Sequence, residues 1–308
     1  MENLTLNYDN KFMQILRKIG SVLLDLAKRI WKGIKIVVGN KKACIGLVIV
    51  TLFIFLAFFG DLIFPYDTAT NWSNRYQKSS WKHWLGTDEL GRDVFRQIVY
   101  GTKSVLSIAF FTAIFTSVIG IGLGLISGYA GGIVDKIIQG ITNIFLTVPN
   151  FPILLLLSQI FTIENPITFA LIMSLWGWAG LCRAVRAQCI SLKERDFIVI
   201  CKVMKFNQFK IIFDELLPNM YSYILINFIM IMKSAITGSV GIMMLGLAAF
   251  EPANWGAMLN RAMSNGLVNP SVMSFMMKPL ITIILFQVGA TLLANGLDEI
   301  FNPRLRQG

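Results

Sequence analysis

The sequence has little of what enzymes and metal proteins use for chemistry. Its 308 residues include one histidine and four cysteines, and the cysteines form no pair at metal or redox spacing. A metal site needs a cluster of such ligands, and a disulfide framework needs regularly paired cysteines, so we expect neither. The P-loop pattern G-x-x-x-x-G-K-[ST] is also absent. We therefore expect no ATP site and no cofactor in this chain.

Charge is scarce as well. Only 15% of the residues are charged, whereas 55% are hydrophobic and the mean hydropathy is +0.63. Soluble domains reach about 45–50% apolar residues even when glycine is counted, so this composition predicts a polytopic membrane protein. A net charge of +11 would suggest nucleic acid for a soluble protein. Here the basic residues lie beside apolar runs, which is the positive-inside pattern, and we expect no nucleic-acid partner.

Six apolar runs are each near the ~20 residues that cross a bilayer, and they predict an all-α protein with six transmembrane helices. The runs are 43–64, 104–127, 136–161, 167–182, 220–247 and 279–297. Pro149 and Pro152 interrupt the third run, where we expect a kink or a break. With residues 1–42 inside, the inner segments hold 19 of the 28 lysines and arginines, and the outer segments hold eight. This asymmetry favours cytoplasmic N- and C-termini.

The remaining segments complete the predicted layout. Residues 1–42 form a basic amphipathic segment suited to an anionic inner leaflet, or alternatively a helix packed on the protein's own cytoplasmic face. Segment 65–103 is expected to be an outer loop with an interfacial helix that Thr87 caps. The core domain, 104–308, holds five spans, an inner loop at 183–219 and an outer loop at 249–278.

The inner loop carries a charged stretch, 191–219, that predicts a helix–turn–helix. Ser191 and Glu194 form S-x-x-E, a signature of a helix start. Asn207 is a candidate cap for the second helix. The apolar residues of the first helix recur at i, i+3, i+4 and i+7 and would line one face: Phe197, Ile200, Cys201 and Met204.

This stretch resembles the cytoplasmic coupling loop of permeases from binding-protein-dependent ABC importers, and most closely the peptide/nickel permease family. H-W-L-G-T-D-E-L-G-R-D at 83–93 resembles the family's H-x-L-G-T-D-x-x-G-R-D. W-G-A-M-L at 255–259 and the C-terminal G-L-D-E-I-F-N-P-R-L-R are similar to family patterns too. The resemblance extends over almost all of residues 43–306. In the coupling loop, Ile200 and Cys201 replace paired alanines, and Lys205 replaces a glycine.

The resemblance implies a type I importer permease fold in the cell membrane, with no enzymatic activity of its own. It implies a second, different permease, two ATPase subunits that hold ATP and Mg, and an extracytoplasmic binding protein. The cargo would be dipeptides or oligopeptides, with nickel complexes or oligosaccharides as alternatives for the same architecture. The residues expected to dock the ATPase are Glu194, Arg195, Asp196, Phe197, Ile200, Cys201, Met204 and Lys205.

Two further sets of residues are candidates. The set before the second span is expected to be a structural ion-pair motif that fixes a turn: Gly86, Thr87, Asp88, Gly91, Arg92 and Asp93. The pathway candidates lie in the fifth span: Asn227, Lys233, Thr237 and Ser239. The family commonly has a glutamate where Ser239 stands. A charge at the bilayer centre costs about 2.5–3.5 kcal/mol, so we expect Lys233 to face the pathway or the partner permease, unless it lies near a bent helix end.

A membrane-embedded enzyme and a secondary transporter are the alternatives from other classes. An intramembrane enzyme needs polar catalytic groups inside its spans, and Lys233 is the one mid-span charge in the predicted helices. A secondary transporter would favour inverted repeats and mid-membrane ion ligands, and neither pattern is visible. The predicted docking loop argues against both, so we expect no catalytic residue and no metal ligand.

Overall fold

The computed structural model describes residues 37–248, 252–266 and 269–301, and these residues are helical apart from turns and connecting segments. The predicted amphipathic segment lies outside the described residues up to position 36. Within the described part there is no strand, and Thr87 and Asp93 form one isolated bridge. The all-α prediction is therefore confirmed for the part of the chain that the structure describes.

Five helices are long and apolar enough to cross a membrane. They are α2 (Lys41–Ile63), α3 (Val94–Ala130), α6 (Pro166–Lys193), α10 (Tyr221–Met244) and α12 (Pro270–Phe301). The pair α4 (Gly132–Thr147) and α5 (Asn150–Ile160) passes the same test together but is bent by 86°. Counted as one broken span, this pair brings the described residues to the predicted six.

The break in the third span lies at the predicted prolines. Val148 is extended, with φ −83° and ψ 128°, and Pro149 follows it as the N-cap of α5. A proline ring disfavours helical backbone in the residue before it, so α4 ends there. Pro152 falls in the first turn of α5, where its missing N–H removes no helical hydrogen bond.

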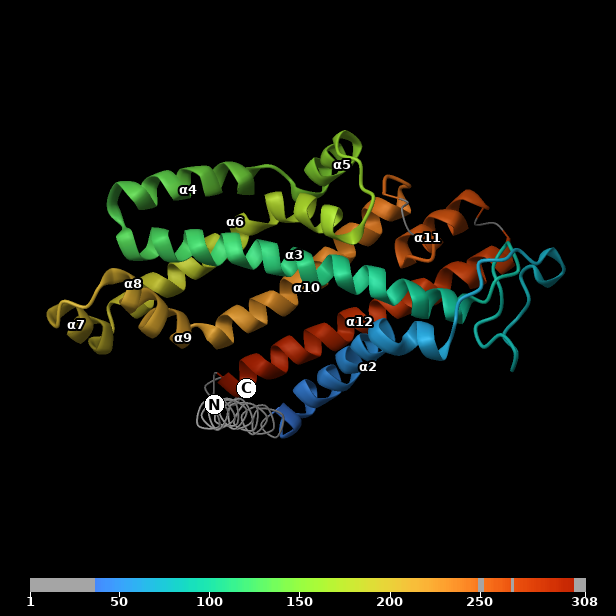
Figure 1. Cartoon of the computed structure of the whole chain (residues 1–308), viewed down its shortest axis with the longest axis horizontal. Helices are drawn as coiled ribbons and strands as arrows, with labels where there is room; N and C mark the ends of the chain where they lie inside the picture. The colour runs from blue at the N-terminus through green and yellow to red at the C-terminus, as the bar shows by residue number, and fades with distance from the viewer. Residues whose placement is uncertain (1–36, 249–251, 267–268, 302–308) are drawn as a thin grey trace, which may run out of the picture.

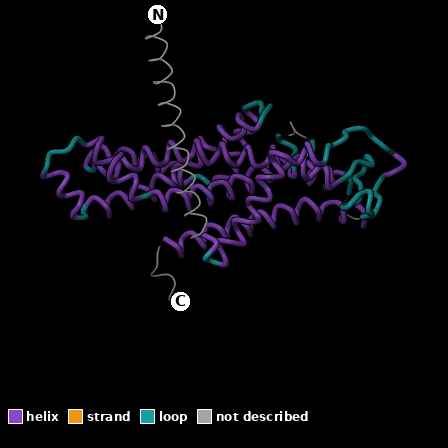
Figure 2. The backbone as a smooth tube through the Cα atoms, turned by 60° about the horizontal axis from the view of Figure 1, so that its bottom comes forward, coloured by secondary structure: helices purple, strands orange, loops and turns teal. Residues whose placement is uncertain are grey.

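The long helices run side by side along the longest axis of the molecule, and most loops gather at its two ends (Figures 1 and 2). One end carries α7 (Asp196–Val203), α8 (Gln208–Lys210), η2 (Ile211–Leu216) and α9 (Leu217–Asn219). The opposite end carries α11 (Trp255–Ser264) and segment 65–93, which contains the turn η1 (Trp72–Asn74). We call these the α7 end and the α11 end.

The packing of α3 against α6 forms the centre of the fold. Gly120, Gly124 and Gly128 recur every four residues on α3 and lie against α6. A Cβ atom on Gly124 would lie 2.7 Å from the carbonyl oxygen of Cys182, and one on Gly128 would lie 2.7 Å from the Cβ of Cys189. Small residues at this spacing let two membrane helices approach backbone to backbone. We call these three residues the glycine seam.

Glycines also attach α2 to α12. A Cβ on Gly46 would lie 2.3 Å from the backbone nitrogen of Leu293, and one on Gly296 would lie 2.4 Å from the backbone nitrogen of Ala43. Beside this contact, Asn40 caps α2 and its amide nitrogen donates to Glu299 at 2.9 Å. The start of α2 therefore lies beside the last turn of α12.

Three predicted boundaries are wrong, and one is the start of the sixth span: α12 begins at Pro270 rather than 279, because Pro279 lies inside the helix and does not start it. The second span begins at Val94 rather than 104, because Asp93 caps α3 by accepting the Arg96 N–H at 3.0 Å. Segment 65–103 therefore contains no separate interfacial helix, and η1 is the one helical turn before α3. The fourth span continues past 182 to Lys193, which places Ser191 inside the last turn of α6 and not at a helix start. The apolar run ends before Arg183, whereas the helical backbone continues to Lys193.

The glycine seam gives a matched pair of variants. Gly124→Leu places a side chain against the backbone of α6, and overpacking of this kind costs typically about 1–3 kcal/mol. Gly122→Leu makes the same change in the same helix, where a Cβ atom would have nothing within 4 Å. We expect the first variant to lose thermal stability in detergent and the second to match the native protein. Equal melting temperatures for the two variants would contradict the close approach of α3 and α6.

Candidate functional site

The helix α7 lies at the far end of α6, joined to it by a two-residue turn. The backbone of α6 ends at Lys193, and Arg195 takes an extended conformation as the N-cap of α7. After α7 the chain turns back, and Asn207 caps α8 by accepting the Phe209 N–H at 3.0 Å, as predicted. The helical segments α8, η2 and α9 then lead into α10. α7 therefore sits between two spanning helices.

One face of α7 packs against the protein itself. Ile198 is fully buried and Cys201 is 8% exposed, and both belong to a cluster with Ile211 and Leu216 of η2. Phe197 is half-buried against the same cluster. These contacts fix the rotation of α7 about its own axis.

The other face of α7 is apolar and exposed. Val203 is 76% exposed and Met204 is 61% exposed, with Val199 and Ile200 beside them on the helix. We call these four residues the α7 surface. Charged side chains that are also exposed surround it: Glu194, Arg195, Asp196, Lys202 and Lys205. Four large apolar side chains that are exposed together and bordered by charged ones are typical of a contact site for another protein.

The residues of the predicted docking set do not all lie on one exposed face. Cys201 is buried inside the chain and cannot contact a partner, and Phe197 is turned halfway inward. Ile200 and Met204 of the predicted set are exposed, and so are Val199 and Val203, which the predicted set did not include. The helix is apolar on both faces, so the i, i+3, i+4, i+7 pattern fits more than one face. The contacts with η2 decide between them.

Lys205 ends α7 in a conformation that usually requires glycine. Its φ is +57°, in the left-handed region. The Lys205 N–H donates to the Lys202 carbonyl and the Phe206 N–H donates to the Cys201 carbonyl, both at 3.0 Å. This is the Schellman motif, whose left-handed position is normally glycine. Lys205 therefore forms this turn at a cost in backbone strain.

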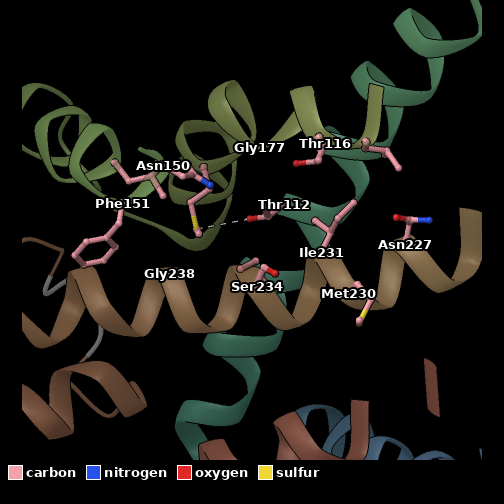
Figure 3. Close-up of a pocket in the computed structure, with 15 residues that line it drawn as sticks. Thr112, Thr116, Asn150, Phe151, Gly177, Asn227, Met230, Ile231, Ser234 and Gly238 are labelled. Carbon is pink, nitrogen blue, oxygen red and sulfur yellow. Dashed lines mark hydrogen bonds between the residues drawn. The ribbon is translucent and has the colours of Figure 1, made fainter. Parts of the chain in front are cut away.

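A cavity of about 380 Å³ lies among α3, α5, α6 and α10. Figure 3 shows side chains of α3, α5 and α6 gathered along one face of α10. The polar residues that line the cavity are Thr112, Thr116, Asn150, Asn227 and Ser234. The hydroxyl oxygen of Thr116 is buried without a hydrogen-bond partner. None of the lining side chains is charged, so the cavity offers hydroxyl and amide groups rather than a fixed charge.

The four pathway candidates lie in different surroundings. Asn227 lines the cavity. Ser239 is 1% exposed, and its hydroxyl donates to the Ile236 carbonyl of its own helix. Lys233 and Thr237 lie on another side of α10, where they contact α12. The sequence pattern could not separate these positions, because all four are polar residues in one apolar helix.

At the α11 end, the carboxylate of Asp88 is fully buried and densely hydrogen-bonded. It lies 2.8 Å from Nη2 of Arg92, which is the predicted ion pair, and it accepts from Arg92 Nε at 2.9 Å. It also accepts from Gln97 Nε2 at 2.8 Å and from two backbone N–H groups. A buried charge needs such partners, so Asp88 fixes the turn that precedes α3.

The same network reaches α11. Arg261 Nη2 donates to Gln97 Oε1 at 2.7 Å, and Arg261 Nε lies 3.0 Å from a Glu89 carboxylate oxygen. Nearby, the fully buried Trp255 donates its indole N–H to the Ile98 carbonyl at 3.1 Å. Segment 65–93, the start of α3 and α11 are therefore held as one body.

The other residues of this motif shape the turn. Gly91 has φ +75°, and a Cβ atom there would lie 1.9 Å from the carbonyl oxygen of Asn71, so no other residue fits. Gly86 is similar, with φ +70°. Thr87 does not cap a helix: its hydroxyl donates to the Asn74 carbonyl. Asp93 is the cap instead, and its second oxygen lies 2.8 Å from Nδ1 of His83.

Two family models match the chain. The model described as binding-protein-dependent transport system inner membrane component matches residues 120–307. This range includes the cavity-lining parts of α6 and α10 and all of α7. The model described as the N-terminal TM domain of oligopeptide transport permease C matches residues 30–78.

Curated proteins are similar to the chain over most of its length. The dipeptide transport system permease protein DppC of Alkalihalophilus pseudofirmus is 35% identical over 276 residues, which cover 87% of each chain. The oligopeptide transport system permease protein OppC of Bacillus subtilis is 30% identical over 270 residues, again 87% of each. The glutathione transport system permease protein GsiD of Pectobacterium atrosepticum is 31% identical and covers 83% of this chain and 85% of its own.

The strained turn at Lys205 predicts a stabilising substitution. A non-glycine residue in left-handed backbone costs about 1–2 kcal/mol, and Lys205→Gly removes that strain. Lys202→Gly serves as the control, because glycine inside a helix is about 1 kcal/mol less favourable than alanine. We expect chymotrypsin to cleave segment 191–219 more slowly in Lys205→Gly and faster in Lys202→Gly than in the native protein. Faster cleavage of Lys205→Gly would contradict the assignment.

Proposed function

Because the chain belongs to the family of binding-protein-dependent transport system inner membrane components, we propose that it is one permease half of an ATP-driven peptide importer. The family is one of transport permeases, and the apolar helices make the chain a multi-pass inner membrane protein. In the proposed assembly a second, different permease completes the pathway. Two ATPase subunits, which hold ATP and Mg, bind on the cytoplasmic side, and an extracytoplasmic binding protein delivers the cargo.

The α7 surface is the observation that carries this proposal. Four exposed apolar side chains stand at one end of the spanning helices, on a helix whose opposite face is anchored to the protein. A groove on an ATPase subunit would bury them and gain their hydrophobic free energy. The start of α2 and the end of α12 contact each other on the half of the molecule nearer α7 (Figure 1). A cytoplasmic α7 would therefore put both on the cytoplasmic side, as the distribution of basic residues predicts.

The position of α7 also supplies a mechanism. α6 and α10 both line the cavity, and α7 is joined to α6 by a tight turn and to α10 through η2 and α9. A displacement of α7 by a closing ATPase dimer would therefore move both helices as rigid bodies. Rocking of this kind opens a membrane pathway first to one side and then to the other. The cavity beside the broken α4–α5 span is the proposed part of that pathway, because broken helices at membrane depth line cavities.

Peptides are the proposed cargo because the similar proteins are named as dipeptide, oligopeptide and glutathione permeases. The lining of the cavity suits this use. Its hydroxyl and amide groups can form hydrogen bonds with a peptide backbone. Because no lining side chain is charged, the cavity would not hold either charged terminus of a peptide by an ion pair. Nickel complexes and oligosaccharides remain alternatives for the same architecture.

The cargo is tested by purification of the complex from the native membrane, with the binding protein attached, followed by mass spectrometry of the bound small molecules. We expect peptides, and we expect the same peptides to raise ATP hydrolysis by the complex in vesicles. A binding protein loaded with a nickel complex or an oligosaccharide would replace the proposed cargo. The absence of any ATPase subunit from the purified complex would overturn the proposal as a whole.

Substitutions that introduce a charge test the role of the α7 surface. Met204→Asp and Ile200→Asp each place a carboxylate in the proposed apolar contact, where an unpaired charge is costly. We expect ATPase association to weaken by about tenfold or more, and peptide-stimulated hydrolysis to fall with it. Both side chains are exposed, so the variants should insert and fold normally. Ser264→Asp, exposed at the α11 end, is the control. Native association in all three variants would refute the docking assignment.

A further inference from the structure

A group of polar side chains joins α10 to α12 at the middle of the two helices. Lys233 Nζ donates to Thr291 Oγ1 at 2.9 Å. Gln287 Nε2 donates to Thr237 Oγ1 at 2.9 Å and to the carbonyl oxygen of Lys233 at 3.0 Å. Thr237 is exposed and the other three residues are half-buried. We call these four residues the polar stripe.

The polar stripe lies deep in the membrane. Lys233 is at the centre of α10, which runs from Tyr221 to Met244, so its Cα is about 17 Å from either end of the helix. Gln287 is near the centre of α12, which runs from Pro270 to Phe301. A lysine side chain is too short to carry its ammonium to the headgroups from this depth. If the Lys233 ammonium faced lipid, its charge would lie in hydrocarbon, which is energetically costly and rare in membrane proteins.

The ammonium of Lys233 is incompletely satisfied by the described residues. It has three N–H donors, and one hydrogen bond is formed, to a hydroxyl group that itself donates to the Gln287 carbonyl at 2.7 Å. None of the ion pairs within the described ranges includes Lys233. The acidic residues of the described spanning helices lie near the helix ends, at Asp61, Asp135, Asp298 and Glu299. A carboxylate at the depth of Lys233 must therefore come from outside the described part of this chain.

The cavity does not supply it. Ser234 lines the cavity, and Lys233 does not. One residue corresponds to about 100° around an α-helix, so Lys233 points away from the cavity and toward α12. On α12 the neighbours of Gln287 and Thr291 along the helix surface are Ile284 and Val288, which are 51% and 47% exposed. The polar stripe is thus bordered by exposed apolar side chains, which is the composition of a surface that contacts another membrane helix.

We propose that the polar stripe is the mid-membrane contact with the partner permease, and that a membrane helix of the partner presents an aspartate or glutamate to Lys233. This inference rests on the proposed function, which supplies the second permease. The partner helix lies along α10 and α12, its apolar side chains contact Ile284 and Val288, and its carboxylate accepts hydrogen bonds from Lys233. The pair is buried between the two subunits, where it fixes their register.

The direct test is a condensation that occurs between an amine and a carboxylate in contact. The native complex in membranes is treated with dicyclohexylcarbodiimide, which enters the bilayer, and the products are mapped by mass spectrometry. We expect an amide bond between Lys233 and one acidic residue of the partner permease, with loss of water to the carbodiimide. Lys233→Met should abolish this product. Lys278→Met, at a lysine nearer the end of α12, should leave it unchanged.

Assembly gives a second measurement. Removal of one member of a buried ion pair leaves the other charge unpaired, so we expect about tenfold less partner permease to co-purify with Lys233→Met than with the native chain. Lys233→Glu should reduce co-purification of the partner permease further. Replacement of the partner's cross-linked acid by lysine should restore co-purification with the Lys233→Glu chain. Lys278→Met is again the control.

The outcomes separate the two proposals. If the native chain co-purifies with no second permease, the proposed function fails. If the partner co-purifies equally with the native chain and with Lys233→Met, and no cross-link from Lys233 to the partner forms, the polar stripe is not the contact. A carbodiimide product between Lys233 and a cargo peptide would overturn the inference in favour of a subsite in the pathway.

Discussion

The close approach of α3 and α6 is the contact on which the rest of the structure depends. In a bilayer the lipid tails are as apolar as leucine, so helices gain little from hydrophobic burial and associate through close packing. The glycine seam supplies that packing at three successive turns of α3. Because α3 and α6 are held to each other, they form one wall of the cavity, and α10 and α5 of the broken span form the rest of its lining. Their separation would remove both the cavity and the support for α7.

The sequence predicted what depends on composition and local chemistry, and it failed where tertiary contacts decide. The spanning helices and the break at Pro149 follow from apolar length and from the proline ring. They are confirmed in the described residues, where there are five spanning helices, or six with the bent α4–α5 pair. The predicted start of α3 and the predicted end of α6 were wrong. A hydropathy pattern ends at the first charged residues, whereas a helix can continue past them. Thr87 was wrongly predicted as a helix cap, because its hydroxyl donates to Asn74 after segment 65–93 folds back, and Asp93 caps α3 instead.

The α7 surface shows the same limit within one helix. Six of the eight residues from Asp196 to Val203 are apolar, so polarity does not assign them to one face of the helix. The contact of Ile198 with η2 fixes its rotation and leaves Val199 and Val203 exposed. By contrast, the motif at the α11 end was predictable in its ion pair, since Asp88 and Arg92 are four residues apart and each needs a partner. Its extension to Arg261 of α11 was not, because that contact spans more than 160 residues of sequence.

The unbroken length of α6 has a mechanical consequence. Its 28 residues form a rod about 42 Å long, from Pro166 to Lys193 beside α7, and the cavity lies along its middle, from Met173 to Leu181. A rod of this length would act as a lever arm in the proposed movement. A tilt of about 10° would swing one end by roughly 7 Å relative to the other, on the helix dimensions alone. A displacement of the order of one side chain at the α7 end is therefore large enough to change the width of the membrane cavity, without any bending of the helix that carries it.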